Sequence, residues 1–275
     1  MDLDTQILLN QAELSIEVMK NIQLFIIPLM VIISASTRAD PNEGSAAVKP
    51  GTEVRLKIDA DPNEILVYIP TDYNDTSAWP VIFYYHGQGE NLSTQRFQTA
   101  TQGKSFIVVS MEFAPVPQGA MTQTQYLAYL RHELKNIAHA ITALQGQLNI
   151  DTKAFVLAGV SRGGWLASDL FITRPGPWAA VAIMCAGYRG IPVRDRELPA
   201  GKFVYIGAGE TDQNLSAAKK ATVYFESHGA DVVFDKYPGL GHAVDPDSPK
   251  LKEWFSVLRE KSKPSPPVKK DDEVK

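Results

Sequence analysis

Residues 154–171 read AFVLAGVSRGGWLASDLF, and this stretch decides how the rest of the chain is interpreted. Its apolar beginning predicts a buried strand, and residues 163–173 predict a helix. Between them, GVSRGG (159–164) predicts a tight turn from strand to helix. Such a turn pushes the hydroxyl of Ser161 out beyond the end of the strand, provided that glycine lets the adjacent backbone segments pass closely. The stretch therefore predicts an exposed serine nucleophile.

Strands and helices alternate on both sides of this stretch. From residue 80 onward the strand candidates are continuously apolar, which is typical of a parallel sheet covered on both faces. The first two candidates alternate and have no helix between them, which predicts an antiparallel start. The sequence thus predicts an α/β fold with a mostly parallel, doubly wound sheet. The predicted strands are 54–58, 65–70, 80–87, 105–113, 154–160, 179–187, 202–209 and 232–238, and the predicted helices follow Thr122 and span 163–173, 214–228 and 249–260.

A second informative segment is YYHGQGE (84–90), at the end of a predicted strand. Glycine on both sides of Gln88 allows its backbone N–H to turn toward the serine. We predict that this N–H and that of Arg162, at the start of the helix, form an oxyanion hole. A simple glycine-rich turn is the alternative. His86 is interpreted as structural rather than catalytic.

The third segment is YPGLGHAVDP (237–246), which follows the last predicted strand. Its glycines leave the loop free to place the imidazole of His242 over Ser161, where a neutral ring takes the hydroxyl proton and later returns it to the leaving group. The remaining histidines are interpreted as solvated or capping residues; they are His132 and His139 on the long helix and His228 at a helix end.

Asp212 is the predicted acid that orients His242 and stabilises its cationic form. It lies in GETDQN (209–214), where a loop precedes a helix, so a helix N-cap is the alternative role. Glu210 is the first substitute for the acid. Asp235 and Asp245 also lie near His242 in the sequence, but the first falls within a strand and the second within a proline-containing turn.

The order Ser161, Asp212, His242 resembles that of the α/β-hydrolase triad. Across residues 54–260 the chain is most similar to small secreted or periplasmic esterases related to dienelactone hydrolase, polyhydroxybutyrate depolymerase and feruloyl-esterase-like enzymes. The resemblance implies hydrolysis of carboxylic esters through an acyl-enzyme, with no metal and no organic cofactor. It implies a small ester or one projecting from a polymer as substrate, because residues 188–201 are too short for a helical lid. Thioester or small-peptide hydrolysis, and a non-catalytic binding protein of the same fold, stay open as alternatives.

Composition excludes some classes of partner. The chain has 275 residues, 44% hydrophobic and 21% charged, with a formal net charge of −4. These values are ordinary for a globular protein, and the basic residues form no stripe, so nucleic acid is not an expected partner. Cys185, the single cysteine, lies in an apolar run and is expected to be a buried small residue.

The two ends of the chain differ from its middle. Residues 1–39 are predicted to be an N-terminal extension with a secretory signal, because an apolar run after Lys20 leads to a small-residue site, and Met19 is the alternative start of translation. A buried or amphipathic helix is the alternative. We expect a linker at 40–52, the hydrolase domain at 53–260 and a disordered tail at 261–275. This organisation predicts export to the periplasm or the medium, without a stable membrane anchor after cleavage.

Overall fold

The structure is a computed structural model that describes residues 49–116, 120–173, 178–190 and 200–262. The chain divides into two compact units, residues 1–46 and 47–275, and all of the described residues belong to the second. The predicted signal sequence, most of the predicted linker and the tail from residue 263 onward lie outside the described residues. The proposed lid-free segment 188–201 is described only at its two ends.

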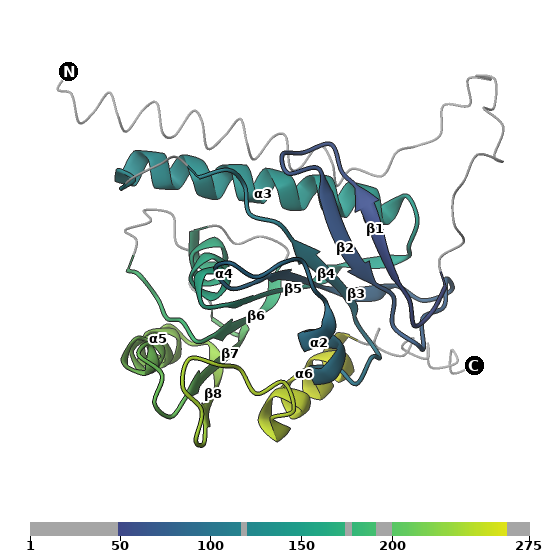
Figure 1. The fold of residues 1–275 in the computed structure, drawn as a ribbon. Helices are drawn as coiled ribbons and strands as arrows, with labels where there is room; N and C mark the ends of the chain where they lie inside the picture. The colour runs from purple at the N-terminus through teal and green to yellow at the C-terminus, as the bar shows by residue number, and fades with distance from the viewer. Residues whose placement is uncertain (1–48, 117–119, 174–177, 191–199, 263–275) are drawn as a thin grey trace, which may run out of the picture. The chain divides into compact units, whose positions relative to one another are not determined.

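An eight-stranded sheet forms the centre of the described unit, in the order β1-β2-β4-β3-β5-β6-β7-β8 (Figure 1). β2 pairs antiparallel with both β1 and β4, and every other neighbouring pair is parallel. The predicted parallel sheet with an antiparallel start is therefore confirmed. The strands are β1 (Glu53–Lys57), β2 (Glu64–Tyr68), β3 (Trp79–Tyr85), β4 (Ile107–Met111), β5 (Ile150–Val160), β6 (Trp178–Met184), β7 (Phe203–Gly209) and β8 (Asp231–Tyr237).

Five helices are described, and the sequence predicts four of them. The long helix begins with a capping box: the Thr122 hydroxyl accepts the N–H of Gln125, whose side-chain oxygen accepts the N–H of Thr122. The missed helix has six residues, of which only Phe97 and Ala100 are buried, so no helical periodicity can emerge from it. The helices are α2 (Gln95–Ala100), α3 (Gln123–Gln145), α4 (Arg162–Thr173), α5 (Leu215–Ser227) and α6 (Pro249–Ser262).

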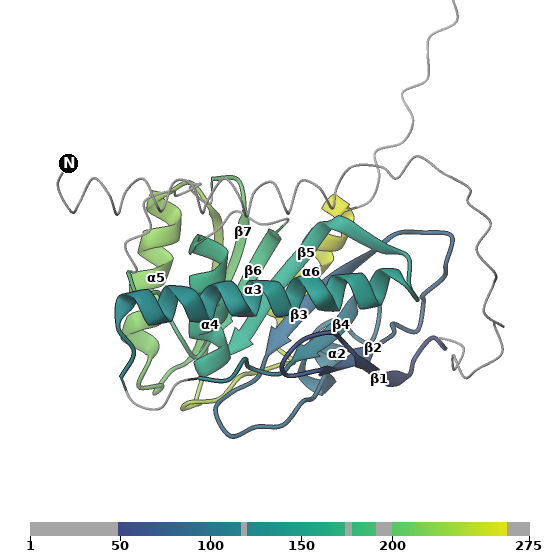
Figure 2. The same cartoon turned by 90° about the horizontal axis from the view of Figure 1, so that it is seen from above.

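Two hydrophobic cores lie on the two faces of the sheet. Along β3, Phe83 and Tyr85 belong to the core beneath α3, α4 and α5, whereas Ile82 and Tyr84 belong to the core beneath α2 and α6. Figures 1 and 2 show the two sets of helices on opposite sides of the strands. Alternate side chains of each central strand therefore bury into different layers, which explains why these strands read as continuous apolar runs. The loops that follow the parallel strands gather at their carboxyl ends, where sites form in such sheets.

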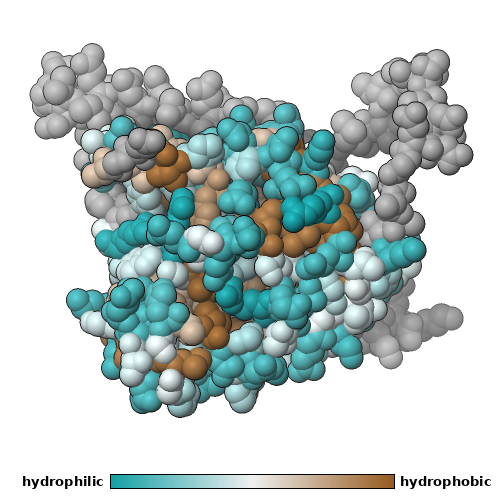
Figure 3. Space-filling view, viewed as in Figure 1, coloured by the Kyte–Doolittle hydropathy of each residue, from teal (hydrophilic) through white to brown (hydrophobic). Residues whose placement is uncertain are grey.

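The surface of the described unit is polar on the face shown in Figure 3, where hydrophobic areas stay separate from one another. Among the described residues, no helix combines the length and the apolar character needed to span a membrane.

A buried acid lies on α4, on the face that packs toward α3. The carboxylate of Asp169 has no exposed side-chain surface and pairs with the guanidinium of Arg189 at 2.9 Å. It also accepts a hydrogen bond from the hydroxyl of Tyr126. Burial raises the pKa of Asp169 to about 6, even though Tyr126 and Arg189 both act to lower it. The ionised form of this carboxyl group is therefore costly in the folded protein.

The Asp169 carboxyl group is expected to make stability fall as the pH rises from about 4 to about 6. In this window the folded protein binds a proton that the unfolded chain has released, so raising the pH favours unfolding. At 1.36 kcal/mol per pKa unit the effect is at most about 3 kcal/mol. Urea unfolding gives the free energy of unfolding at each pH in this range. The slope of that free energy against pH should differ between the wild type and Asp169→Asn. The exposed Asp247→Asn is the control, and equal slopes in all three proteins would refute the assignment.

Candidate active site

Ser161 occupies the turn between β5 and α4, as the sequence predicts. Its φ is +53°, a left-handed conformation that is uncommon for a residue with a side chain. The N–H of Ser161 donates to the carbonyl of Met184 at 2.8 Å, and its own carbonyl accepts the N–H of Trp165 at 3.0 Å. The backbone on both sides of the serine is thus fixed by the neighbouring strand and by the first turn of the helix. Strain held in this way is typical of functional positions.

The glycines around Ser161 are required by close backbone contact. A Cβ atom on Gly159 would lie 2.1 Å from the carbonyl oxygen of Gly163. A Cβ atom on Gly163 would lie 2.1 Å from the carbonyl oxygen of Tyr85 and 2.7 Å from that of His86. The predicted need for small residues at both positions is confirmed. The second contact also shows that the first turn of α4 lies directly against the end of β3.

Replacing Gly163 with alanine is expected to destabilise the protein by about 3 kcal/mol, because neither partner of the clash is a movable side chain. Gly146→Ala is the matched control. Its φ is −70° and its added Cβ atom would meet the nearest oxygen at 3.5 Å. We expect the control to change the free energy of unfolding by less than about 1 kcal/mol. Chemical denaturation measures both, and equal effects would contradict the packing described for the turn.

His242 connects Ser161 to Asp212. The Nε2 atom of His242 lies 2.8 Å from Oγ of Ser161, and its Nδ1 atom lies 2.8 Å from Oδ1 of Asp212. Because a carboxylate can only accept, Nδ1 carries the proton of the neutral ring, and Nε2 is then free to accept the serine hydroxyl. The side chain of His242 is 35% exposed, whereas that of Asp212 is fully buried. Three residues from three loops therefore form a hydrogen-bonded series that opens to solvent at the serine.

Asp212 contacts His242 and is not the N-cap of α5, because that position is held by Asn214. Its Oδ1 accepts the N–H of Asn214 at 2.7 Å, and its carbonyl accepts the N–H of Leu215 at 3.0 Å, so it also shapes the turn before α5. Its other oxygen, Oδ2, is buried without a hydrogen-bond partner among the residues described. A carboxylate fixed by backbone groups keeps a constant orientation toward the imidazole.

The alternative acids make other contacts. Glu210 pairs with Lys236 at 2.6 Å and accepts the N–H of Gly239 at 3.2 Å. Asp235 is buried beneath the hydroxyl groups of Tyr205 and Ser248. Both residues hold the ends of the loop that carries His242, and neither is the carboxylate that contacts its imidazole.

Cys185 is buried, as predicted, but its location is more informative than the sequence suggests. Its sulfur, a carboxylate oxygen of Asp212 and a ring nitrogen of His242 all lie within 4.8 Å of one another. Burial, and after it the neighbouring Asp212, raises the pKa of the Cys185 thiol to about 12. Metal binding through sulfur needs a thiolate, and Nδ1 of the imidazole is already engaged by Asp212. The three groups therefore fit a hydrogen-bonded acid and base better than a metal centre.

The two predicted oxyanion donors lie on segments that touch. Arg162 is the first residue of α4, so its N–H points along the open end of that helix. Gln88 is exposed and follows the His86–Gly87 segment, against which Gly163 packs. The Arg162 guanidinium lies 4.0 Å from the centre of the Phe113 ring. The assignment of the two N–H groups to an oxyanion hole stays a prediction.

The remaining histidines and aromatic residues lie outside the series. His86 is buried, with Nδ1 2.8 Å from the carbonyl of Gly87 and Nε2 3.5 Å from a carboxylate oxygen of Glu112. His228 contacts the carbonyl of Tyr224 at the end of α5. Trp178 begins β6, at the end of the sheet opposite to Ser161, and is buried.

Several solved structures share the fold of this chain. No protein-family model matches the chain, and no curated protein matches it in sequence. A phospholipase/carboxylesterase from Dyadobacter fermentans superposes with a TM-score of 0.54 at 15% identity, covering 71% of this chain and 95% of that one. The Bacillus cereus carboxylesterase gives 0.52 at 18% identity, covering 75% and 93%. The fold is that of an α/β-hydrolase.

A third similar structure is a ferulic acid esterase from Anaeromyces mucronatus in complex with ferulic acid, with a TM-score of 0.52 at 13% identity, covering 79% of this chain and 92% of that one. At such identities the likeness concerns the fold. The chemistry of this chain therefore depends on its own side chains.

Proposed function

We propose that the protein is a serine hydrolase that cleaves carboxylic esters. The observation that carries the proposal is the series Ser161, His242, Asp212, with two contacts of 2.8 Å and a serine in the left-handed conformation. This arrangement provides a nucleophile, a base and a group that orients the base. Two proteins of similar structure are named as a carboxylesterase and a ferulic acid esterase, which agrees with the proposal.

In the proposed mechanism, the Ser161 hydroxyl loses its proton to Nε2 of His242 as Oγ forms a bond to the ester carbonyl carbon. The negative charge that develops on the carbonyl oxygen is stabilised by the N–H groups of Gln88 and Arg162. The imidazolium then gives its proton to the alkoxide that leaves, and an acyl-serine remains. Water repeats these steps with His242 as base, which releases the acid and restores Ser161.

Asp212 contributes by stabilising the imidazolium that forms twice in each cycle. Its buried carboxylate shares a hydrogen bond with Nδ1, so the positive charge is generated next to a fixed negative one. The serine end of the series is accessible, since the side chain of His242 is 35% exposed. An open site of this kind suits a small ester, or one that projects from a polymer, and we propose these as substrates. We also propose that the protein is exported and has no stable membrane anchor after cleavage of its signal.

Turnover of p-nitrophenyl acetate, an acyl-thioester and a chromogenic dipeptide would test the proposal. We expect the ester to be cleaved with the highest kcat/KM. Faster cleavage of the thioester or the dipeptide would support one of the alternative activities on the same triad. No turnover of any of the three, together with no reaction with an active-site phosphonate, would favour a non-catalytic binding protein.

A further inference from the structure

Both backbone groups of Gly87, the residue before the predicted oxyanion donor, are held in place. Its N–H donates to Oε2 of Glu90 at 3.0 Å. Its carbonyl lies 2.8 Å from Nδ1 of His86 and accepts the N–H of Glu90 at 3.2 Å. Because Gly87 is buried, its N–H needs a hydrogen-bond partner within the protein. The carboxylate of Glu90 is a strong acceptor for it.

These contacts fix the direction of the Gln88 N–H. The carbonyl of Gly87 and the N–H of Gln88 belong to one trans peptide plane, in which they point to opposite sides. The carbonyl of Gly87 points toward His86 and the Glu90 N–H, so the N–H of Gln88 points in the opposite direction. Rotation of the Gly87 backbone would redirect the Gln88 N–H, and glycine has more freedom to rotate than other residues.

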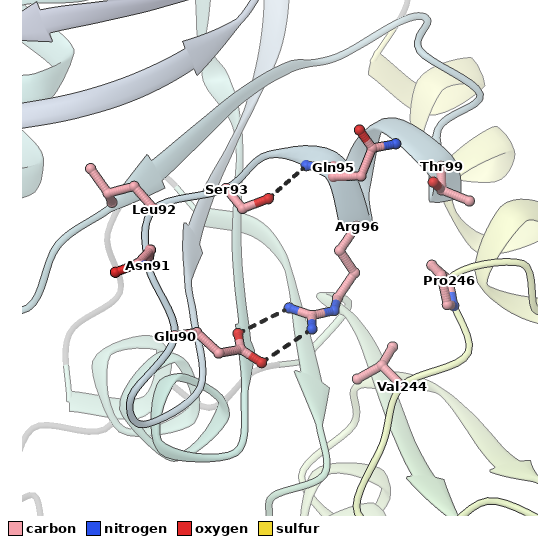
Figure 4. A pocket seen from close by; sticks show the side chains of 9 residues that line it. All are labelled: Glu90, Asn91, Leu92, Ser93, Gln95, Arg96, Thr99, Val244 and Pro246. Carbon is pink, nitrogen blue, oxygen red and sulfur yellow. Dashed lines mark hydrogen bonds and ion pairs between the residues drawn. The ribbon is translucent and has the colours of Figure 1, made fainter.

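Arg96 connects this turn to the core of the domain. Its guanidinium approaches the two carboxylate oxygens of Glu90 at 3.3 and 3.4 Å, and Figure 4 shows it extending from α2 toward them. The same guanidinium donates to the hydroxyl of Tyr84, which is fully buried on β3. Partial burial raises the pKa of Glu90, but the Gly87 N–H and Arg96 outweigh it and hold that pKa below its usual value. Glu90 is therefore a firmly ionised acceptor at neutral pH.

We propose that Glu90 and Arg96 are positioning residues for catalysis, which hold the Gly87–Gln88 peptide so that the Gln88 N–H faces the oxyanion. The inference rests on the proposed function and deepens it. The path runs from Tyr84 in the core through Arg96 and Glu90 to Gly87, and each link is a contact described above. A small displacement of an oxyanion donor raises the free energy of the transition state far more than that of the bound substrate.

A contribution to stability alone would not explain this arrangement. The side chains of Arg96 and Glu90 are 28% and 43% exposed and line an open groove of about 560 Å³ beside the loop that carries Val244 and Pro246 (Figure 4). Exposed ion pairs contribute little to folding. Glu90 accepts the N–H of Gly87, which is buried next to the site, whereas Glu210, paired with Lys236, accepts the N–H of the exposed Gly239.

Glu90→Ala is expected to lower kcat for p-nitrophenyl acetate by about 10–100-fold, which is less than the loss on removing an oxyanion donor itself. KM should change by less than about twofold, because the loss falls on the transition state. The dissociation constant of a trifluoromethyl ketone, which forms a tetrahedral oxyanion on serine, should rise by the same factor as kcat falls. Arg96→Met should act in the same direction, and Arg96→Lys should recover part of the loss.

Glu64→Gln is the matched control, since Glu64 forms an exposed pair with Arg55 at 2.7 Å on the β1–β2 edge. We expect it to leave kcat and ketone affinity unchanged. The inference is overturned if Glu90→Ala and Arg96→Met keep wild-type kcat and ketone affinity, or if ketone affinity holds while KM alone rises. Should Glu90→Ala fail to fold, Glu90→Gln and the Arg96 variants carry the same comparison.

A second measurement separates this inference from the proposed function. Hydrogen exchange of the peptide that spans residues 86–92 should be faster in Glu90→Gln than in the wild type, because the Gly87 N–H has a weaker acceptor. Unchanged exchange would contradict the role of Glu90 even in an active enzyme. Absence of esterase activity in the wild type would instead refute the proposed function, while exchange still reports whether Glu90 holds the loop.

Discussion

Replacing Ser161 with alanine is expected to reduce kcat for ester hydrolysis by ~10⁵–10⁶-fold, because the nucleophile and base act as one unit. The fold should survive, since the backbone contacts of Ser161 with Met184 and Trp165 do not use its hydroxyl. Steady-state turnover of p-nitrophenyl acetate, together with circular dichroism, measures both parts of this prediction.

Ser227→Ala is a suitable control for that variant, since Ser227 lies at the end of α5. Its hydroxyl donates to the carbonyl of Tyr224 and lies 3.1 Å from Nδ1 of His228. It should retain wild-type turnover. Loss of activity on changing Ser227, or retention of more than a few per cent on changing Ser161, would mean that the reaction uses another nucleophile.

Asp212→Asn is expected to lower kcat by about 10⁴-fold with little change in KM. An amide has no negative charge to stabilise the imidazolium, and its NH₂ group favours the ring tautomer in which Nε2 carries the proton. That tautomer cannot accept the Ser161 hydroxyl. The kinetic constants for p-nitrophenyl acetate, taken at several pH values, measure the loss and show whether it persists across the range.

Glu210→Gln provides the comparison that the sequence calls for, because Glu210 is the alternative acid. It contacts Lys236 and Gly239, so we expect its replacement to change kcat by less than about fivefold. Equal losses in the two variants would contradict the assignment of Asp212 as the partner of His242.

The sequence predicts the fold and the nucleophile well, because both depend on local patterns. The strand before Ser161, the helix after it and the glycines between them are adjacent in the chain, and each requirement can be read from residue type. The alternation of apolar runs and helices similarly defines the parallel sheet. Only α2 is missed, since six residues are too few to show a period.

The partners of Ser161 are harder to predict, because they depend on where separate loops meet. Asp212, Glu210 and Asp235 all lie within or near two strand ends, and nothing in their spacing shows which carboxylate reaches His242. The structure distinguishes them by their partners: Asp212 contacts Nδ1 of His242, Glu210 contacts Lys236 and the Gly239 N–H, and Asp235 contacts two hydroxyl groups. Arg96 and Cys185 lie in none of the motifs, and Glu90 ends the YYHGQGE segment without any sequence signal for its contact with Gly87. The positions of these three residues relative to the site follow from the tertiary arrangement of β3, α2 and β6.

Peptide mapping by mass spectrometry after reaction with a fluorophosphonate tests the central claim most directly. If Ser161 is the activated nucleophile, the phosphonyl group will be found on the peptide that contains Ser161, and the Ser161→Ala protein will carry no label. A folded wild-type protein that remains unlabelled, or that is labelled at a different residue, would contradict the account.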